Sequence, residues 1–387
     1  MRVLVVNAGS SSLKLALLDH EDRTIAAREL DAPRAIVAPQ AVRAALDDGF
    51  AGADVVGHRI VHGGARFRTG VLIDAGVESE LRDLVDLAPL HQPKSLAALD
   101  AVSAALPDVP AVACFDTAFH ATLPGAASTY ALPAAWRERW GLRRYGFHGL
   151  SHAWVARRAP ELLDRAPAGL RIVSCHLGAG ASLCAIDGGR SVDTTMGFTP
   201  LEGLVMATRS GSVDPGLVLW LLEHTELSEH SLADALEHDS GLTGLAGTGD
   251  MRVLVERAAA GDGPAELAIG VYVHRLRAGI AAMAAALGGL DALVFTGGVG
   301  EHSAAVRSAA VAGLAFLGVA VDPARNHGVG GDTDISSRQA RARTLVITAR
   351  EDLEIARESR AALTAGRPAG TDDGLPVTTV GIPVSLG

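Results

Sequence analysis

The chain has 387 residues, of which 48% are hydrophobic and 20% are charged, and it contains 44 glycines. This length is enough for two domains with packed cores, and the composition indicates a globular protein. The net charge of −10 comes from acidic and basic residues mixed along the chain, without a basic stripe. We therefore expect neither nucleic acid nor an anionic membrane surface as a partner.

In chain order, runs of β-branched and aliphatic residues predict strands at 3–6, 13–18, 55–61, 111–115, 171–175, 182–186, 292–296 and 344–348. Helical patterns lie between many of these runs, at 78–87, 93–105, 150–166, 214–224, 264–287, 302–315 and 352–365. This alternation predicts an α/β fold. The last segment, 366–387, has no apolar periodicity and is expected to be a poorly ordered tail.

The first two predicted strands are joined by a turn rich in small hydrogen-bonding residues, Asn7 to Ser12. Strand, glycine-centred turn and strand recur at 174–187, where His176 aligns with Asn7 and Gly178 with Gly9. One such hairpin is common among proteins. Two of them, each opening a separate half of the chain, predict duplicated halves that face one cleft.

A third glycine cluster, at 293–303, follows a predicted buried strand and leads into a helix. Glycines let backbone approach a ligand closely, and a helix N-terminus favours an anion. The alternative is an ordinary strand-to-helix turn with Ser303 near the N-cap. The chain contains no GxxxxGK[ST] motif, which argues against a Walker-type ATPase.

Charged residues stand in four short motifs, at 57–64, 114–120, 145–152 and 207–215. Arg59 and Arg209 are candidates for binding anions, because a planar guanidinium can grip a carboxylate or phosphate with two hydrogen bonds. A structural salt bridge is the alternative for each. Asp116 follows a predicted strand and could orient Mg²⁺ through water, accept a proton, or cap the next helix.

Histidines are frequent in these and neighbouring motifs: His58, His62, His91, His120, His148, His152 and His176. No HExxH motif or paired Cys/His spacing is present, so we do not expect zinc. Most of these histidines are expected to be hydrogen-bonded structural imidazoles. His148, between Phe147 and Gly149, is the best candidate for contact with a transferring group.

The cysteines, Cys114, Cys175 and Cys184, form no CxxC pair and no even disulfide framework. This pattern fits a reducing compartment, with all three thiols buried as small apolar groups. No signal-peptide pattern precedes the first strand, and the apolar stretch 279–287 is too short to span a bilayer. We therefore expect a cytoplasmic protein.

Taken together, the motifs resemble those of the acetate kinases over about residues 2 to 360. They follow the family's order: VNAGSSSLK, GHRIVHGG, LAPLH, FDTAFH, RRYGFHGLSH, CHLGAG, MGFTPLEGL, TRSGSVDP, SGLTGLAG, FTGGVGEHS and EDLEIARE. The resemblance implies an α/β fold of two duplicated actin-like (ribonuclease H-like) domains around a central cleft, and a homodimer. It implies an N-terminal domain at 1–120, a nucleotide-binding domain at 121–351, and a returning helix with a flexible tail at 352–387.

The resemblance also implies the reaction ATP + acetate ⇌ ADP + acetyl phosphate with Mg²⁺, and a role for each matching residue. Arg59, His148 and Arg209 would hold the acceptor carboxylate and the transferring phosphoryl group, with Asp116 also catalytic. Asp116, Glu351 and Asn7 would manage the metal. The nucleotide and its phosphates would be bound by Ser10, Ser12, Lys14, His176, Gly178, Gly180, Gly297, Gly298 and Gly300. The acceptor would be bound by Arg59, Val61, Leu90, His91, Phe147 and Pro200.

Acetate is already ionised at neutral pH, so its transfer needs no general base. The implied mechanism is direct in-line transfer, in which the protein aligns two anions and offsets their repulsion. A sugar kinase would instead need Asp116 as a base for an alcohol. Because Val61 is bulkier than alanine, we expect acetate to be preferred over propionate or butyrate, while a kinase for those longer acids remains the alternative.

Five positions depart from the asparagine that is common in the family: Gln92, Ala179, Gly249, His302 and Arg350. Asparagine occurs in this chain only at 7 and 326, and a general scarcity accounts for most of these changes. Ala179 removes an amide from a phosphate loop, which costs a hydrogen bond worth about 1–3 kcal/mol. His302 and Arg350 flank the implied nucleotide pocket, so pyrophosphate is kept as an alternative donor. Two different functions on the same fold also stay open, an actin-like binding protein and an exopolyphosphatase-like hydrolase.

Overall fold

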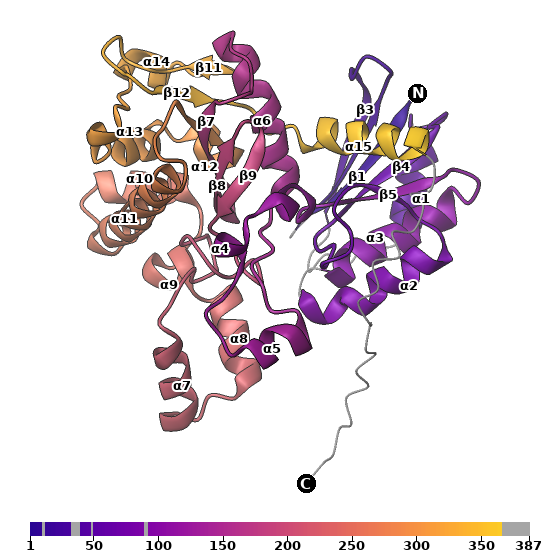
Figure 1. Cartoon of the computed structure of the whole chain (residues 1–387), viewed down its shortest axis with the longest axis horizontal. Helices are drawn as coiled ribbons and strands as arrows, with labels where there is room; N and C mark the ends of the chain where they lie inside the picture. Colours follow the sequence, from indigo (N-terminus) through magenta and orange to yellow (C-terminus); the bar gives the residue numbers. More distant parts are fainter. Residues whose placement is uncertain (10–11, 32–38, 48, 89–91, 366–387) are drawn as a thin grey trace.

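The computed structural model describes residues 1–9, 12–31, 39–47, 49–88 and 92–365. Within them the chain forms two six-stranded mixed sheets, with strand orders β3-β2-β1-β4-β6-β5 and β11-β12-β10-β7-β8-β9. Figure 1 shows the two sheets side by side, each with helices on its faces. This is the predicted α/β fold with two actin-like halves.

The first sheet is built on a hairpin followed by parallel strands. Strand β1 pairs antiparallel with β2 and parallel with β4, and β4 pairs parallel with β6. The strand bounds are β1 (Val3–Ala8), β2 (Ser12–Leu18), β3 (Thr24–Asp31), β4 (Val55–Ile60), β5 (Val71–Leu72) and β6 (Ala111–Phe115). Because side chains alternate along a strand, β1 presents Leu4 and Val6 to one face and Val3 and Val5 to the other.

Helices cover both faces of the first sheet. Leu4 and Val6 pack with α1 (Pro39–Asp47) and α3 (Gln92–Ala105), and Val3 and Val5 pack with α15 (Glu351–Ala365). In Figure 1 α15 lies beside β1 and β4, although it follows the second sheet in sequence. The C-terminal helix thus returns to the first sheet, while the domain limits 1–120, 121–351 and 352–387 stay a prediction.

The second sheet repeats the hairpin and its parallel neighbours. Strand β7 pairs antiparallel with β8 and parallel with β10, which in turn pairs parallel with β12. The strand bounds are β7 (Arg171–Leu177), β8 (Ala181–Asp187), β9 (Arg190–Thr194), β10 (Ala292–Thr296), β11 (Thr333–Asp334) and β12 (Arg343–Val346). The repeat of strand, glycine-centred turn and strand seen in the sequence therefore forms the same part of two similar sheets.

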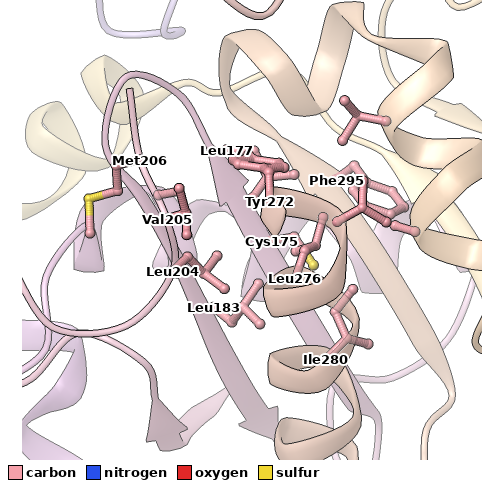
Figure 2. Packing of buried hydrophobic residues seen from close by; sticks show 14 of the residues in the cluster. Cys175, Leu177, Leu183, Leu204, Val205, Met206, Tyr272, Leu276, Ile280 and Phe295 are labelled. Atoms are coloured by element: carbon pink, nitrogen blue, oxygen red, sulfur yellow. The ribbon is translucent and has the colours of Figure 1, made fainter. Parts of the chain in front are cut away.

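The largest core lies between this sheet and α11 (Gly263–Ala286). Figure 2 shows Tyr272, Leu276 and Ile280 of that helix packed on Cys175, Leu183 and other strand residues. The opposite face is covered by α6 (Gly149–Leu163), whose Val155 and Ala159 pack on Ile172 and Val294. The remaining elements are α2 (Ala75–Asp83), η2 (Leu84–Leu87), η3 (Ala118–Thr122), α4 (Gly125–Ser128), α5 (Ala134–Trp140), α7 (Pro215–His224), α8 (Glu229–His238), α9 (Gly241–Ala246), α10 (Met251–Ala259), α12 (Gly297–His302), α13 (Ala304–Ala312), η4 (Ala315–Leu317) and α14 (Pro323–His327).

Within the described residues, α11 is long and apolar enough to span a membrane by length and composition alone. It is longer than the stretch 279–287 considered from the sequence. Eight of its residues are buried, Tyr272 and Ile280 among them, and they face the second sheet and its neighbouring helices. Burial along one side is typical of a helix that packs its apolar face against the core of a globular domain.

All eight predicted strands are present, but the short or polar strands β3, β5, β9 and β11 were missed. The helix predicted at 302–315 is present as α13, although it is shorter than predicted. Ser303 is its N-cap, as the sequence suggested, because the Ser303 side chain accepts a hydrogen bond from the Val306 amide. The predicted tail, 366–387, lies outside the described residues.

Candidate active site

A pocket of about 200 Å³ lies where the carboxyl ends of strands from both sheets meet. Strands β1, β4, β6 and β7 end at its wall. The pocket is lined by Ala8, Gly9, Arg59, Val61, Lys94, Asp116, Phe147, His148, His176, Gly180, Pro200, Arg209 and Glu351. The structure thus brings together most of the residues that the sequence marked as catalytic or acceptor-binding.

Four side chains on the first-sheet wall form one hydrogen-bonded network. Asp116 accepts from Arg59 Nη2 at 2.6 Å and from Arg59 Nε at 3.1 Å. Arg59 Nη1 donates to Asn7 Oδ1 at 3.1 Å, and Asn7 Nδ2 donates to Glu351 Oε2 at 2.8 Å. Arg59 therefore makes the salt bridge that was the alternative to anion binding, while its guanidinium still lines the pocket.

Burial and charge act in opposite directions on the two carboxylates of this network. Burial raises the pKa of Asp116, and the neighbouring Arg59 partly offsets that rise. Burial also acts to raise the pKa of Glu351, but Arg59, His176 and the Asn7 amide outweigh it and lower the pKa. Glu351 is therefore anionic at neutral pH, and the short two-pronged contact with Arg59 fits an anionic Asp116 as well.

Oxygen ligands for a hard cation are present at this wall, although they are few. In the described part of the chain, no group of three or more His, Cys, Asp and Glu side chains has the spacing of a metal site. Mg²⁺ commonly takes one or two carboxylates and completes its shell with water and phosphate oxygens. Asp116 and Glu351, with the Asn7 amide, fit that donor set.

Histidines on the second-sheet wall are held by serines. His148 Nδ1 is hydrogen-bonded to Ser182 Oγ at 2.9 Å, and His176 Nδ1 to Ser151 Oγ at 2.8 Å. The two imidazole rings stack with centroids 4.4 Å apart. Burial, the other imidazole and the nearby arginines lower the pKa of His148 well below its usual value. Because His148 Nδ1 is occupied, its Nε2 is the nitrogen left to face the pocket.

The backbone around His148 fixes this orientation. His148 has a left-handed φ of 55°, which is uncommon for a residue other than glycine. The next residue, Gly149, donates its amide to the Asp116 carbonyl at 2.8 Å, and a Cβ there would lie 2.2 Å from that oxygen. Only glycine therefore lets α6 begin against the end of β6 and aim His148 into the pocket.

Arg209 approaches from the loop between β9 and α7. Its Nη1 donates to the Pro200 carbonyl at 2.6 Å, and its Nε lies 3.8 Å from Glu237 Oε2. A Cβ on Gly180 would lie 2.6 Å from Arg209 Nη2 and 3.2 Å from His148 Nε2. The glycine in the β7–β8 turn thus leaves the space in which these two donors converge. Val61, Phe147 and Pro200 form the apolar part of the same pocket.

A larger cavity of about 760 Å³ continues from the pocket. The two share Gly9, Arg59, His176 and Glu351. The larger cavity is also lined by Ser12, Lys14, Gly297, Gly298, Glu301 and Asp352, among others. Glu301 accepts from the Gly297 and Ala349 amides at 2.9 Å and so ties the start of α12 to the chain before α15.

The residues predicted to bind the nucleotide do not all line a cavity. Ser12 and Lys14 face the larger cavity, where both contact Glu29. Gly178 lines neither cavity and donates its amide to the Gly180 carbonyl, and Gly300 is a buried residue of α12 that lines neither cavity. Ser10, Leu90 and His91 lie outside the described residues.

For three of the five positions that depart from the family pattern, the structure shows what the residue contacts. Gln92 is buried and bonded to the backbone of His62 and Leu81, so its role is structural. Arg350 makes a two-pronged ion pair with Asp352 and lines neither cavity. The backbone carbonyl of Ala179 accepts from the Ala207 amide.

Sequence reasoning missed Lys94, the supporting serines and Glu237. Lys94 had a usable signal, because it is one of only two lysines in the chain and follows the LAPLH motif.

Two actin-like halves with arginines, neutral histidines and paired carboxylates at their junction define a phosphotransferase. Residues 25–357 match the acetokinase family model, and the chain belongs to the acetokinase family. It is 41% identical to an acetate kinase of Acetivibrio thermocellus over 392 residues, which cover 93% of this chain and 98% of that protein. It is 50% identical to an acetate kinase of Gloeobacter violaceus over 307 residues, covering 79% and 76%.

Solved structures of similar proteins have the same fold along nearly the whole chain. A Porphyromonas gingivalis acetate kinase superposes with a TM-score of 0.84 at 35% identity, covering 94% of this chain and 99% of that one. A Francisella tularensis propionate kinase superposes with a TM-score of 0.86 at 34% identity, covering 93% and 99%.

Proposed function

We propose that this protein catalyses the reversible, Mg²⁺-dependent transfer of a phosphoryl group from ATP to acetate, giving ADP and acetyl phosphate. The observation that carries the proposal is the convergence of Arg59, His148 and Arg209 on one pocket with an apolar wall. Relatives named acetate kinase support the choice of acceptor. Membership in the acetokinase family argues against the two other functions considered from the sequence, an actin-like binding protein and an exopolyphosphatase-like hydrolase.

The acceptor would lie with its carboxylate toward the arginines and its methyl group toward Val61, Phe147 and Pro200. Acetate is ionised at neutral pH, so no side chain has to remove a proton from it. Asp116, held by Arg59, is therefore not needed as a base. A pocket of about 200 Å³ that also has to admit the phosphoryl group favours a short acyl chain.

The protein would promote transfer by holding charge in place. The transferring phosphoryl group carries negative charge that must approach a negatively charged acceptor. His148 would donate from Nε2, and Arg59 and Arg209 would place two guanidinium groups around the same oxygens. The serine bonds of the histidines and the Pro200 contact of Arg209 keep these donors in position before substrate arrives.

Asp116, Glu351 and Asn7 would hold Mg²⁺ together with water and phosphate oxygens. When bound, the ion would neutralise phosphate charge between the two substrates. A carboxylate has about four acceptor sites, so Asp116 could keep its contact with Arg59 while it meets the metal or a water bound to it.

The larger cavity would bind the nucleotide. Gly297 and Gly298 at the start of α12 allow a close approach of ligand to backbone, and Lys14 and Ser12 supply polar groups on the opposite wall. A cavity of about 760 Å³ suits a nucleoside triphosphate, and pyrophosphate would leave much of it unfilled. Arg350 is held by Asp352 and is not a free cation for phosphate.

We further propose a cytoplasmic homodimer that binds neither nucleic acid nor membrane. All three cysteines are free and buried, which supports a reducing compartment. Helix α7, which projects from the second half in Figure 1, has no buried residue and exposes Leu217, Leu219 and Trp220. Exposed apolar side chains gathered on one helix support a self-association surface, and sedimentation of the purified protein tests the dimer.

The experiment that tests the proposed function is a panel of donors and acceptors. Purified protein is given ATP or pyrophosphate with acetate, propionate or butyrate, and acyl phosphate is trapped with hydroxylamine. We expect the highest kcat/KM with ATP and acetate, and a lower value with propionate. A higher kcat/KM with propionate would make the protein a propionate kinase, and phosphate release without acyl phosphate would overturn the proposed function.

A further inference from the structure

Three cations face the 200 Å³ pocket, and they differ in how their charge is balanced. Arg59 is paired with Asp116 at 2.6 Å, and Arg209 has Glu237 at 3.8 Å. Among the residues that the structure describes, Lys94 has no carboxylate within 4.0 Å. Among the described residues, Lys94 is therefore the cation of this pocket without a paired carboxylate.

Lys94 and Glu237 lie on opposite sides of the cleft. Lys94 is in the first turn of α3, which packs on the first sheet, whereas Glu237 is near the end of α8, which lies in sequence between strands β9 and β10 of the second sheet. Burial lowers the pKa of Lys94, Glu237 opposes this, and Arg209 adds to it. Lys94 and Arg209 line the same pocket, and Arg209 Nε lies 3.8 Å from Glu237 Oε2, so the three charged groups lie near one another.

Glu237 is a buried carboxylate without a cation at hydrogen-bonding distance. It is 9% exposed, and its ion pair with Arg209 is longer than a hydrogen bond. Burial raises the pKa of Glu237, and the cations Arg209, His238 and Lys94 act against that rise. A buried carboxylate is costly without a close cation, so a second cation that approaches Glu237 would be stabilising.

We propose that Lys94 and Glu237 form an ion pair across the cleft when the two halves close around the substrates, and that this pair positions the Arg209 guanidinium. The inference rests on the proposed function, because it takes Arg209 as the group that meets the acceptor. Lys94 and Glu237 are then positioning residues. The pair neutralises Lys94, which would otherwise repel Arg209, and draws Glu237 to a fixed place beside Arg209.

The test compares Lys94→Met, Glu237→Gln and their combination. Each single variant should lower kcat about tenfold with a smaller change in the KM for acetate, and the combined variant should be no worse than the more damaged single variant. The surface pair Arg66 and Glu80 is the matched control, and Arg66→Met, Glu80→Gln and their combination should leave kcat unchanged.

A second readout does not depend on turnover. Small-angle scattering with Mg²⁺–ADP should show a smaller radius of gyration for the wild type than for either single variant. Additive losses of kcat in the combined variant, or equal compaction of all variants, would overturn the ion pair. A rise in the KM for acetate in Lys94→Met alone would also overturn it, because Lys94 would then bind the acceptor directly.

Failure of the proposed function gives a different result. A wild type that forms no acyl phosphate but still compacts more than the single variants would contradict the acceptor while supporting the ion pair. A wild type that does not compact would contradict the pair whatever its activity.

Discussion

The smaller pocket and the larger cavity of the cleft share Gly9, Arg59, His176 and Glu351, yet their walls are held in different ways. In the smaller pocket, buried carboxylate, amide, serine and backbone groups fix the arginines and histidines. In the larger cavity, Lys14 is 63% exposed and meets only Glu29 among the described residues, at 4.0 Å. The groups proposed to act on the transferring phosphoryl are therefore preorganised, whereas those proposed to bind the nucleotide are left to adjust to it.

The largest effect is expected when a fixed donor of the smaller pocket is removed. Arg209→Ala should lower kcat by about 10²–10³-fold, since one preorganised donor at developing charge is worth that much. Acyl phosphate formation measured with hydroxylamine checks it. Lys14→Met, on the adjustable wall, should mainly raise the KM for ATP. Equal losses in kcat from both variants would contradict the distinction.

The second prediction tests the space between the fixed donors. Gly180→Ala places a methyl group 2.6 Å from Arg209 Nη2, so Arg209 must move, and kcat should fall about 10- to 100-fold. Gly298→Ala, in the larger cavity, meets no protein atom within 4 Å but adds a methyl group where the nucleotide approaches the backbone, so it should raise the KM for ATP and leave kcat nearly unchanged. The melting temperature of both variants should stay near that of the wild type. An unchanged kcat in Gly180→Ala would refute the convergence of Arg209 and His148.

The third prediction concerns the apolar end of the smaller pocket. Val61→Ala makes room for about one more carbon, which is worth about 1–3 kcal/mol in a hydrophobic pocket. The ratio of kcat/KM for propionate to that for acetate should rise about tenfold. Parallel assays with the two acids measure it. If the ratio does not move, Val61 is not at the acyl end.

The last prediction concerns stability and separates buried from exposed histidines. Burial lowers the pKa of His58 to about 3 and of His62 and His120 to about 4. Unfolded histidines take up protons near pH 6.5 while these three stay neutral in the folded protein, so stability is full above that pH and falls as pH decreases. The loss between pH 7 and pH 5 should be about 2 kcal/mol for each histidine.

Denaturant titrations at the two pH values check this prediction. His58→Leu should reduce the pH dependence, because both ring nitrogens of His58 are buried without a partner among the described residues. His20, whose side chain is 69% exposed, provides the control, and His20→Leu should leave the pH dependence unchanged.

Much of the site could be predicted from residues that stand at strand ends. Asn7, Arg59, Asp116 and His176 each end or follow an apolar run, and parallel strands bring such positions to one edge. The two hairpins were also visible, because a repeated strand, glycine turn and strand leaves a pattern in the sequence. The edge strands β3 and β9 were missed because their polar residues do not alternate clearly with apolar ones.

What could not be predicted depends on contacts between distant segments. The bond of His148 to Ser182 joins residues 34 positions apart, and the ion pair of Arg209 with Glu237 joins a loop to helix α8. Nothing local to Ser182 or Glu237 distinguishes either residue from other polar residues in a strand or helix. Their roles follow only from how the sheets and helices are placed.

The central claim is that Arg59, His148 and Arg209 surround the phosphoryl group as it passes directly to an ionised acceptor. A crystal structure with Mg²⁺–ADP, acetate and a planar aluminium fluoride mimic of the transferring group tests this most directly. We expect the planar group between the ADP β-phosphate and acetate, within hydrogen-bonding distance of all three side chains. A mimic located away from these residues, or a phosphorylated side chain trapped during turnover, would contradict the account.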